Sequence, residues 1–168
     1  MSAYLRFSLA AGAALAIALT TSVVLRAATT TATLTVTANV AAECTATSTT
    51  LGFGNYSALV STNIDAQATF TVACTKDTTA TVGLDLGGHS SAGARRMADT
   101  GNTNFIPYEL YTDTGRTTVW GNASGSWVSL SAAPSNAPRT LFVYGRTVNG
   151  LNVPVGGYSD AVTITVTF

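Results

Sequence analysis

Three residues that lie close together, Asp85, His89 and Ser90, are of the types that form a serine hydrolase triad. The stretch Gly87–Gly93 around them is rich in glycine and serine, as a nucleophile elbow is. It lacks the second glycine of that motif, and no strand–turn–helix pattern surrounds it. A triad is also assembled in space rather than from neighbouring residues. We therefore interpret the stretch as a polar loop with a solvated histidine and predict that the protein is not an enzyme.

The carboxylates give no stronger evidence for a catalytic site, because they are scattered singly along the chain. They include Asp65, Asp77, Asp85, Asp99, Glu109, Asp113 and Asp160. Two of them could meet in space as a glycosidase pair. Several lie in turns, where aspartate accepts hydrogen bonds from backbone amides, and we favour that interpretation. The adjacent Arg95 and Arg96 lie in a glycine-rich stretch and are interpreted as a solvated doublet on a loop.

The cysteines and the histidine set limits on metal chemistry. Cys44, Cys74 and the single histidine, His89, cannot supply the four ligands of a structural zinc site. We predict no metal and no cofactor. Since the chain has the features of an exported protein, a disulfide between Cys44 and Cys74 is expected. Closing a loop of about 30 residues stabilises the folded state by about 3–4 kcal/mol in the chain-entropy account.

Residues 1–27 have the features of a secretory signal peptide. Arg6 precedes an apolar run from Phe7 to Leu19, and its 13 residues are too few for a membrane span of about 20. Cleavage after Ala27 is tolerable, and cleavage after Ser22 is an alternative. A retained membrane anchor is the competing interpretation of this segment.

The remaining residues, about 140 in number, are enough for one domain. Residues 28–168 contain six basic and eight acidic side chains, a net charge of −2. The chain therefore lacks the basic patch that nucleic-acid binding requires. Threonine, alanine, serine, glycine and valine dominate, and short alternating runs separated by turn residues predict a β-sandwich with Greek-key connections. The expected strands include residues 68–74, 80–86, 105–111, 117–120, 126–130, 140–146 and 161–168.

The alternation is clearest at the two ends of this part, in residues 31–40 and 161–168. Period-two alternation predicts a strand with one apolar face, and such a strand needs a sheet to lie on. One at each end of an exported all-β chain suggests a protein that gives one strand away and receives another.

Six aromatic residues could instead build a carbohydrate-binding platform. They are Tyr108, Tyr111, Trp120, Trp127, Phe142 and Tyr144. At alternating strand positions such residues are more often core or cross-strand pairs, and we favour a core role.

Four motifs resemble those of the spore coat protein U domain family, which includes the major subunits of archaic, Csu-type chaperone–usher pili. They are Leu51–Tyr56, Tyr108–Asp113 with Arg116–Gly121, Val143–Arg146, and Val153–Asp160 before the terminal strand. Each motif is loose, but their order and spacing together are specific and cover essentially all of the mature chain. Cys44 and Cys74 fall where such subunits carry their disulfide.

The resemblance implies an all-β fold, namely an incomplete immunoglobulin-like β-sandwich completed by donor-strand complementation. Residues 1–27 would be the signal peptide, 28–40 the N-terminal donor strand and 41–168 the domain. The donor side chains that enter a neighbour's groove would be Leu34, Val36, Ala38 and Val40. The strand on the acceptor side would present Val162, Ile164, Val166 and Phe168.

The function implied by the resemblance is that of a structural subunit of a surface pilus. It would be exported through the periplasm, assembled by a chaperone–usher pathway through donor-strand exchange, and serve adhesion and biofilm formation. The expected partners are copies of itself in a head-to-tail homopolymer, a periplasmic chaperone and an outer-membrane usher, with no nucleic acid and no small-molecule substrate. The alternative is a secreted spore-coat or surface-coat protein that fills its own groove.

Overall fold

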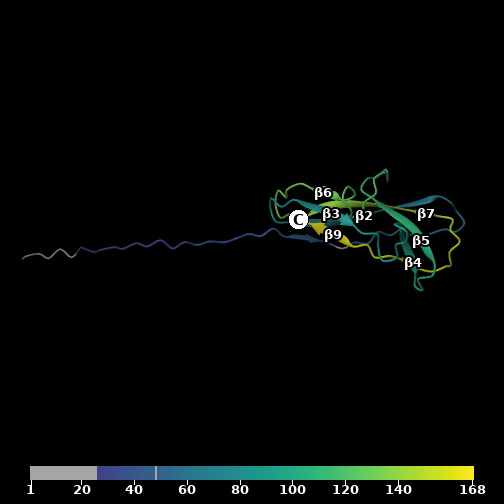
Figure 1. Ribbon diagram of the computed structural model, residues 1–168, viewed down its shortest axis with the longest axis horizontal. Coiled ribbons are helices and arrows are strands. Elements are labelled where there is room, and N and C mark those ends of the chain that lie inside the picture. The colour runs from purple at the N-terminus through teal and green to yellow at the C-terminus, as the bar shows by residue number, and fades with distance from the viewer. Residues whose placement is uncertain (1–25, 48) are drawn as a thin grey trace, which may run out of the picture. The chain divides into compact units, whose positions relative to one another are not determined.

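The computed structural model describes residues 26–47 and 49–168, which contain nine β-strands and no helix (Figure 1). The strands are β1 (Cys44–Ala46), β2 (Asn63–Cys74), β3 (Ala80–Leu84), β4 (Arg95–Asp99), β5 (Phe105–Tyr111), β6 (Val128–Leu130), β7 (Arg139–Val148), β8 (Tyr158–Ser159) and β9 (Ile164–Thr167). The predicted signal peptide lies outside the described residues except for its last two positions. Since the described part has no helix, it also has none long and apolar enough to cross a membrane.

The chain divides into two units, which meet at Ala38 and Asn39. In the described part of the first unit, residues 26–38, there is no strand and every residue is exposed. The second unit, Asn39–Phe168, holds all nine strands.

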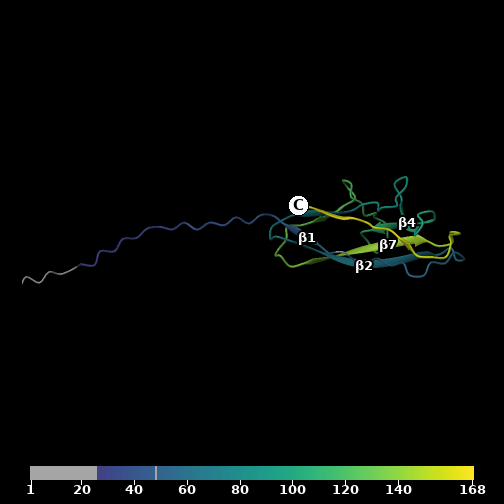
Figure 2. The ribbon, with the colours of Figure 1, turned by 90° about the horizontal axis from the view of Figure 1, so that it is seen from below.

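The second unit consists of two antiparallel sheets. One has the strand order β1-β2-β7-β5-β4-β8, and the other has the order β6-β3-β9. The long pairing of β2 with β7 runs from Asn63 opposite Val148 to Val72 opposite Arg139 and forms the backbone of the larger sheet (Figure 2). The predicted all-β fold is confirmed. The short alternating runs form sheets because each run has one apolar face, which it can bury only against another sheet.

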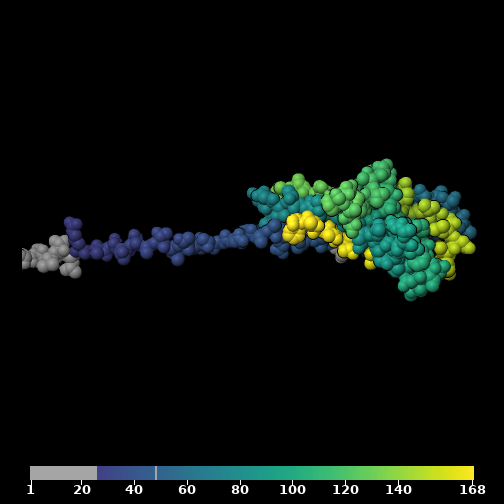
Figure 3. All heavy atoms as spheres, viewed as in Figure 1, coloured from purple at the N-terminus to yellow at the C-terminus, as the bar shows by residue number. Residues whose placement is uncertain are grey.

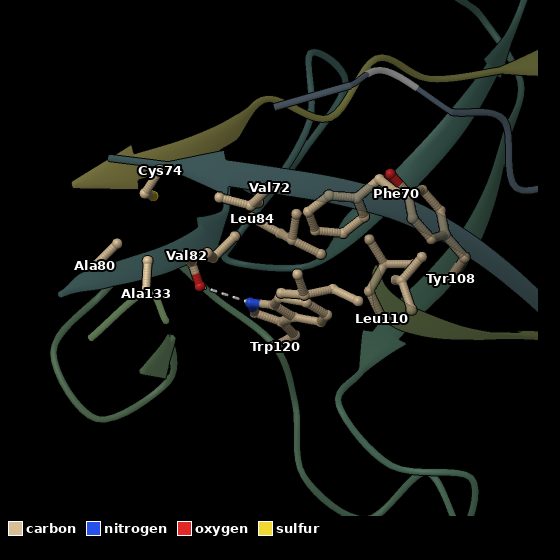
Figure 4. Packing of buried hydrophobic residues seen from close by; sticks show 12 residues of the cluster. Phe70, Val72, Cys74, Ala80, Val82, Leu84, Tyr108, Leu110, Trp120 and Ala133 are labelled. Atoms are coloured by element: carbon tan, nitrogen blue, oxygen red, sulfur yellow. Dashed lines mark hydrogen bonds between the residues drawn. The ribbon is translucent and has the colours of Figure 1, made fainter. Parts of the chain in front are cut away.

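The hydrophobic core lies between the two sheets. Phe70, Leu110 and Val143 enter it from the larger sheet, while Val82 and Leu84 enter it from the smaller one. Trp120 is buried at the centre, and its indole Nε1 donates a hydrogen bond of 2.8 Å to the carbonyl oxygen of Val82 (Figure 4). The disulfide predicted between the two cysteines is also present and joins β1 to β2, where the cysteines are opposite in register.

Most strand predictions are confirmed, with shifted ends. Strand β2 begins five residues before the expected run 68–74, and the expected terminal strand is shortened to Ile164–Thr167. The segment 117–120 forms only an isolated bridge, between Val119 and Tyr111. The arginine doublet, interpreted as part of a loop, lies instead in strand β4.

The interpretation of the arginine doublet as solvated is wrong for Arg95, which is completely buried. Strand β4 directs this side chain inward, opposite Tyr108. Its Nε donates to the carbonyl oxygen of Asp85, its Nη2 donates to the carbonyl oxygens of Leu84, Asp85 and Trp120, and its Nη1 pairs with Glu109. A guanidinium suits this place because its planar set of donors can satisfy several strand-end carbonyls at once.

The core role expected for the aromatic residues holds for Tyr108 and Trp120 only. Tyr111 and Tyr144 are half-buried, while Trp127 and Phe142 are 41% and 48% exposed. Phe142 and Tyr144 occupy the outward positions of β7 and stack on each other, with ring centroids 6.5 Å apart. Alternation placed them correctly on one face, but which face is inward depends on the sheet that covers it.

The buried guanidinium gives a direct test of the fold. We expect Arg95→Met to lower the free energy of unfolding by about 3–5 kcal/mol, because it leaves Glu109 and three carbonyls without their partner. Arg96→Met is the matched control and should cost less than about 1 kcal/mol, since the half-buried Arg96 lies over the ring of Phe105. Urea unfolding followed by tryptophan fluorescence measures both, and equal costs would contradict the structural role of Arg95.

Candidate functional site

The smaller sheet ends at β9, whose outer edge has no strand partner among the described residues. On its inner edge β9 pairs with β3, from Ile164 opposite Leu84 to Thr167 opposite Thr81. The larger sheet ends at β1, which lies beside β9 without pairing to it. Figure 3 shows the C-terminal segment, in yellow, at the surface of the second unit. The sandwich is therefore open along the side where these two edge strands meet.

A groove with a volume of about 920 Å³ opens beside the start of β9, between Val162 and Ile164 on one side and the connection from β1 to β2 on the other. Its floor contains core residues, among them Phe70, Leu110 and Val143, each 5% exposed or less. Val162 and Ile164 form one wall. Side chains of the hydrophobic core thus form the floor of a groove that opens to the outside, although each is itself nearly buried.

The second wall is formed by residues 49–58, which connect β1 to β2. Leu51 and Phe53 pack onto the larger sheet at Gly145, where a side-chain Cβ would lie only 2.9 Å from both of them. Phe53 also contacts Tyr108, with ring centroids 6.1 Å apart. Glycine at position 145 of β7 is what allows this wall to lie so close to the sheet.

The four residues expected on the acceptor side do not share one environment. Val162, Ile164 and Val166 alternate with exposed threonines and pack against the core, and the first two line the groove. Phe168, in contrast, is 55% exposed at the end of the chain. Of the expected donor residues, Leu34, Val36 and Val40 are at least 80% exposed, and Ala38 is exposed as well.

The segment leading into β9 is held by Asp85, one of the residues considered for catalysis. Its carboxylate accepts hydrogen bonds of 2.9 Å from the backbone amides of Gly87 and Thr163. Burial raises the pKa of Asp85, but the hydrogen bonds from Thr163 and Gly87 outweigh burial and leave it below its ordinary value of 3.8. Asp85 thus acts as an ionised clamp on the start of the groove wall.

A second clamp is centred on Asp160, whose side chain is 2% exposed. Its Oδ1 lies 2.9 Å from Nδ1 of His89, and its Oδ2 accepts a hydrogen bond of 2.7 Å from the hydroxyl of Tyr108. Burial raises the pKa of Tyr108, and the bond to Asp160 raises it further. Tyr108 therefore stays a neutral donor that ties β5 to the segment before β9.

Asp85, His89 and Ser90 form no triad in the structure, in line with the sequence analysis, but the interpretation of His89 as solvated is wrong, since its side chain is 31% exposed and paired with Asp160. His89 faces Asp160, Asp85 binds backbone amides, and Ser90 is exposed. Sequence reasoning did not find the Asp160 clamp, although Asp160 stands in one of the motifs that carried the resemblance. No sequence pattern links Asp160 to His89 and Tyr108; in the structure Gly87 makes room for the clamp, since its backbone is left-handed (φ +79°) and a Cβ there would lie 2.0 Å from Asp160.

Comparisons with known proteins agree with this architecture. The family described as "Spore Coat Protein U domain" matches residues 30–165. "Protein U" of Myxococcus xanthus is 35% identical over 130 residues, which are 71% of this chain and 72% of that protein.

A solved structure supports the fold: the CsuC–CsuE chaperone–tip adhesion subunit pre-assembly complex from the archaic chaperone-usher Csu pili of Acinetobacter baumannii. It matches with a TM-score of 0.56 and 21% identity over 77% of this chain. The matched part is 40% of that solved chain, so this chain spans less than half of its length. With the open side of the sandwich, this likeness confirms the predicted incomplete immunoglobulin-like fold.

The Asp85 clamp predicts how the groove wall responds to mutation and to pH. Asp85→Ala should lower the amide protection of Thr163 about fivefold, because a hydrogen bond worth about 1 kcal/mol is lost. In the unmodified protein the same protection should decline as the pH falls from 3.8 through the lower folded pKa, since protonation removes the charge that the folded state stabilises.

Hydrogen exchange followed by NMR measures this protection. Asp113→Ala is the control, because Asp113 accepts bonds from Thr117 and Thr118 in a turn that does not contact β9. Equal protection of Thr163 in the Asp85→Ala variant and the unmodified protein would contradict the clamp.

Proposed function

The chain belongs to the Spore Coat Protein U domain family, and we propose that it is a structural subunit of a surface pilus assembled by donor-strand exchange. The observation that supports this most directly is the groove of about 920 Å³ beside Val162 and Ile164, where β9 begins with one edge unpaired among the described residues. A groove with core residues on its floor and a free strand edge beside it fits one kind of ligand well, an extended segment with alternating apolar side chains.

Residues 29–40 of another copy have the chemistry that this groove requires. Leu34, Val36, Ala38 and Val40 occupy alternate positions, so all four side chains point the same way in an extended strand. Burying Leu34, Val36 and Val40 contributes roughly 5–9 kcal/mol, since each buried Leu or Val is worth about 1.5–3 kcal/mol. Backbone pairing with β9 adds to this and sets the register.

Head-to-tail donation of a strand between identical subunits produces a fibre. The donating surface and the accepting surface differ, so the contact is heterologous and leaves a free groove at one end and a free strand at the other. In this proposal the mature chain begins after a signal peptide at residues 1–27, and residues 28–40 are the donor segment of the domain 41–168.

The open groove also calls for partners during export. An unpaired strand edge beside an open apolar groove favours aggregation, so a periplasmic chaperone would fill the groove until an outer-membrane usher exchanges it for the next subunit. The solved Csu complex pairs a chaperone with a pilus tip subunit before assembly, which supports this order of events. The assembled fibre would act at the cell surface in adhesion and biofilm formation, in a structural rather than a catalytic role.

A second candidate function is that of a coat protein whose own N-terminal segment fills the groove. Membership of the Spore Coat Protein U domain family and the likeness to Protein U favour this candidate. Electron microscopy of the exported protein distinguishes the two, because donor exchange yields fibres and self-filling yields monomers or sheets.

We expect Val36→Asp to reduce polymer at least tenfold when the chain is coexpressed with its chaperone and usher, because an ionised carboxylate cannot be buried in an apolar groove without a partner. Thr35→Asp is the control and should assemble normally, since its side chain points away from the groove in the proposed register. The amount of polymer is measured on denaturing gels of unheated fibres. Normal assembly of the Val36→Asp variant would show that Val36 is not a donor residue.

Deleting residues 29–40 should give a soluble subunit–chaperone complex and no fibre, because the acceptor groove remains while the donor is lost. Adding a synthetic peptide of residues 29–40 should then displace the chaperone from that complex, which size-exclusion chromatography detects. Fibres formed by the deletion variant would contradict the proposed function.

A further inference from the structure

The disulfide stands at the point where the proposed donor segment joins the folded domain. Cys44 is the first residue of β1, and only residues 41–43 separate it from Val40, the last of the proposed donor side chains. Cys74 is the last residue of β2 and lies opposite Cys44 in register. In a fibre joined by donor strands, tension on a subunit therefore enters its domain at this bond.

Tension leaves the same domain at β9. In the proposed assembly the donor of the next copy lies along β9, and β9 pairs on its inner edge with β3. The chain reaches β3 from Cys74 through residues 75–79. A short path therefore joins the two connections of a subunit, namely the disulfide, this segment and the pair of strands β3 and β9.

The segment 75–79 is fastened to the core and suits the transmission of tension. The amide of Asp77 donates a hydrogen bond of 2.8 Å to the carbonyl oxygen of Ala133, and the amide of Ala133 donates one of 3.0 Å to the carbonyl oxygen of Thr78. Ala133 is itself 1% exposed. A segment bonded in this way has little slack, because these bonds have to break before it can lengthen.

Without the disulfide the same tension would follow the chain through residues 45–73. This stretch begins with the rest of β1, an edge strand in which Thr45 and Ala46 are exposed. Pulling at the first residue of such a strand breaks its hydrogen bonds to β2 one after another, and each contributes only about 1 kcal/mol. Strand β1 would therefore peel from the larger sheet.

Behind β1 lies the groove wall formed by residues 49–58. Leu51 and Phe53 hold this wall on the larger sheet at Gly145, and Phe53 contacts Tyr108. Peeling that continued past β1 would pull the wall from the sheet and open the groove in which the next copy's strand lies. Tension on one connection would then loosen the next connection along the fibre.

We propose that the Cys44–Cys74 disulfide diverts tension around residues 45–73, so that the wall of the groove is not pulled when the fibre is stretched. This inference rests on the proposed function and gives the bond a role besides stability. The stabilising effect of a disulfide depends mainly on the length of the loop that it closes. The diversion depends on position, because this bond joins the first residue of β1 to the residue from which the chain leads to β3.

Pulling single fibres with optical tweezers before and after reduction tests the inference. Reduced fibres should break at a force at least twofold lower than oxidised fibres, and they should lengthen in steps before they break, as β1 and the groove wall detach. Alkylation and mass spectrometry measure the extent of reduction. Fibres of the Cys44→Ala/Cys74→Ala variant are the control for the reductant, and they should behave like reduced fibres whether or not it is present.

The variant Thr47→Ala locates the path of the tension. Thr47 follows β1, and its Oγ1 accepts a hydrogen bond of 2.9 Å from the amide of Thr71, within the stretch that the disulfide protects. We expect this variant to break at the normal force while the disulfide is intact, and at a lower force than reduced unmodified fibres once it is reduced. A lower breaking force with the disulfide intact would overturn the inference, because tension would then pass through β1.

The remaining outcomes separate this inference from the proposed function. Reduced fibres that break at the same force as oxidised fibres overturn the inference alone. Reduced fibres that fall apart in electron micrographs without any pulling do so as well, because the bond would then hold the groove together at rest. If the unmodified chain builds no fibre, the proposed function is wrong and this inference is wrong with it.

Discussion

The unpaired edge of β9 is the constraint on which the rest of the structure depends. Backbone amides and carbonyls in an apolar setting need partners, and β9 finds them on one side only, in β3. On the other side, core residues such as Phe70 and Val143 lie on the floor of a groove. In the proposed assembly a strand from another copy completes this sandwich, so the fold and the assembly of the protein are one problem.

The polar groups around the groove explain how an open edge is kept in shape. Asp85 and Asp160 hold the segment before β9, and the buried Arg95 joins β4 and β5 to the end of β3. Arg95 and Asp160 bond to groups on strands β3 and β5, while Asp85 bonds to the backbone amides of Gly87 and Thr163, just outside the strands. A preformed groove lowers the entropy lost when a strand enters it, so in the proposed assembly these clamps serve strand binding, although their residue types first suggested catalysis.

Alternation in the sequence was enough to predict the strands, but not which face of each strand points to the core. Residues 68–74, 140–146 and 161–168 became strands because each run has one apolar face, and the cysteine pair followed from composition. Phe142 and Arg95 were misjudged for a common reason. The side of a strand that faces the core is fixed by the other sheet, which no local pattern contains. The groove itself could not be predicted from residues alone, since it arises where a strand is absent.

The two alternating ends of the chain differ in how they are held, and the proposed assembly depends on this difference. Residues 31–40 and 161–168 have nearly the same pattern, yet only the second forms a strand, at β9. Asp160 stands directly before the C-terminal run and ties it to Tyr108 and His89. Residues 27–40 contain no charged residue at all. An amphipathic segment without such a clamp keeps its apolar face available, and this difference between two otherwise similar runs is what a donor and an acceptor require.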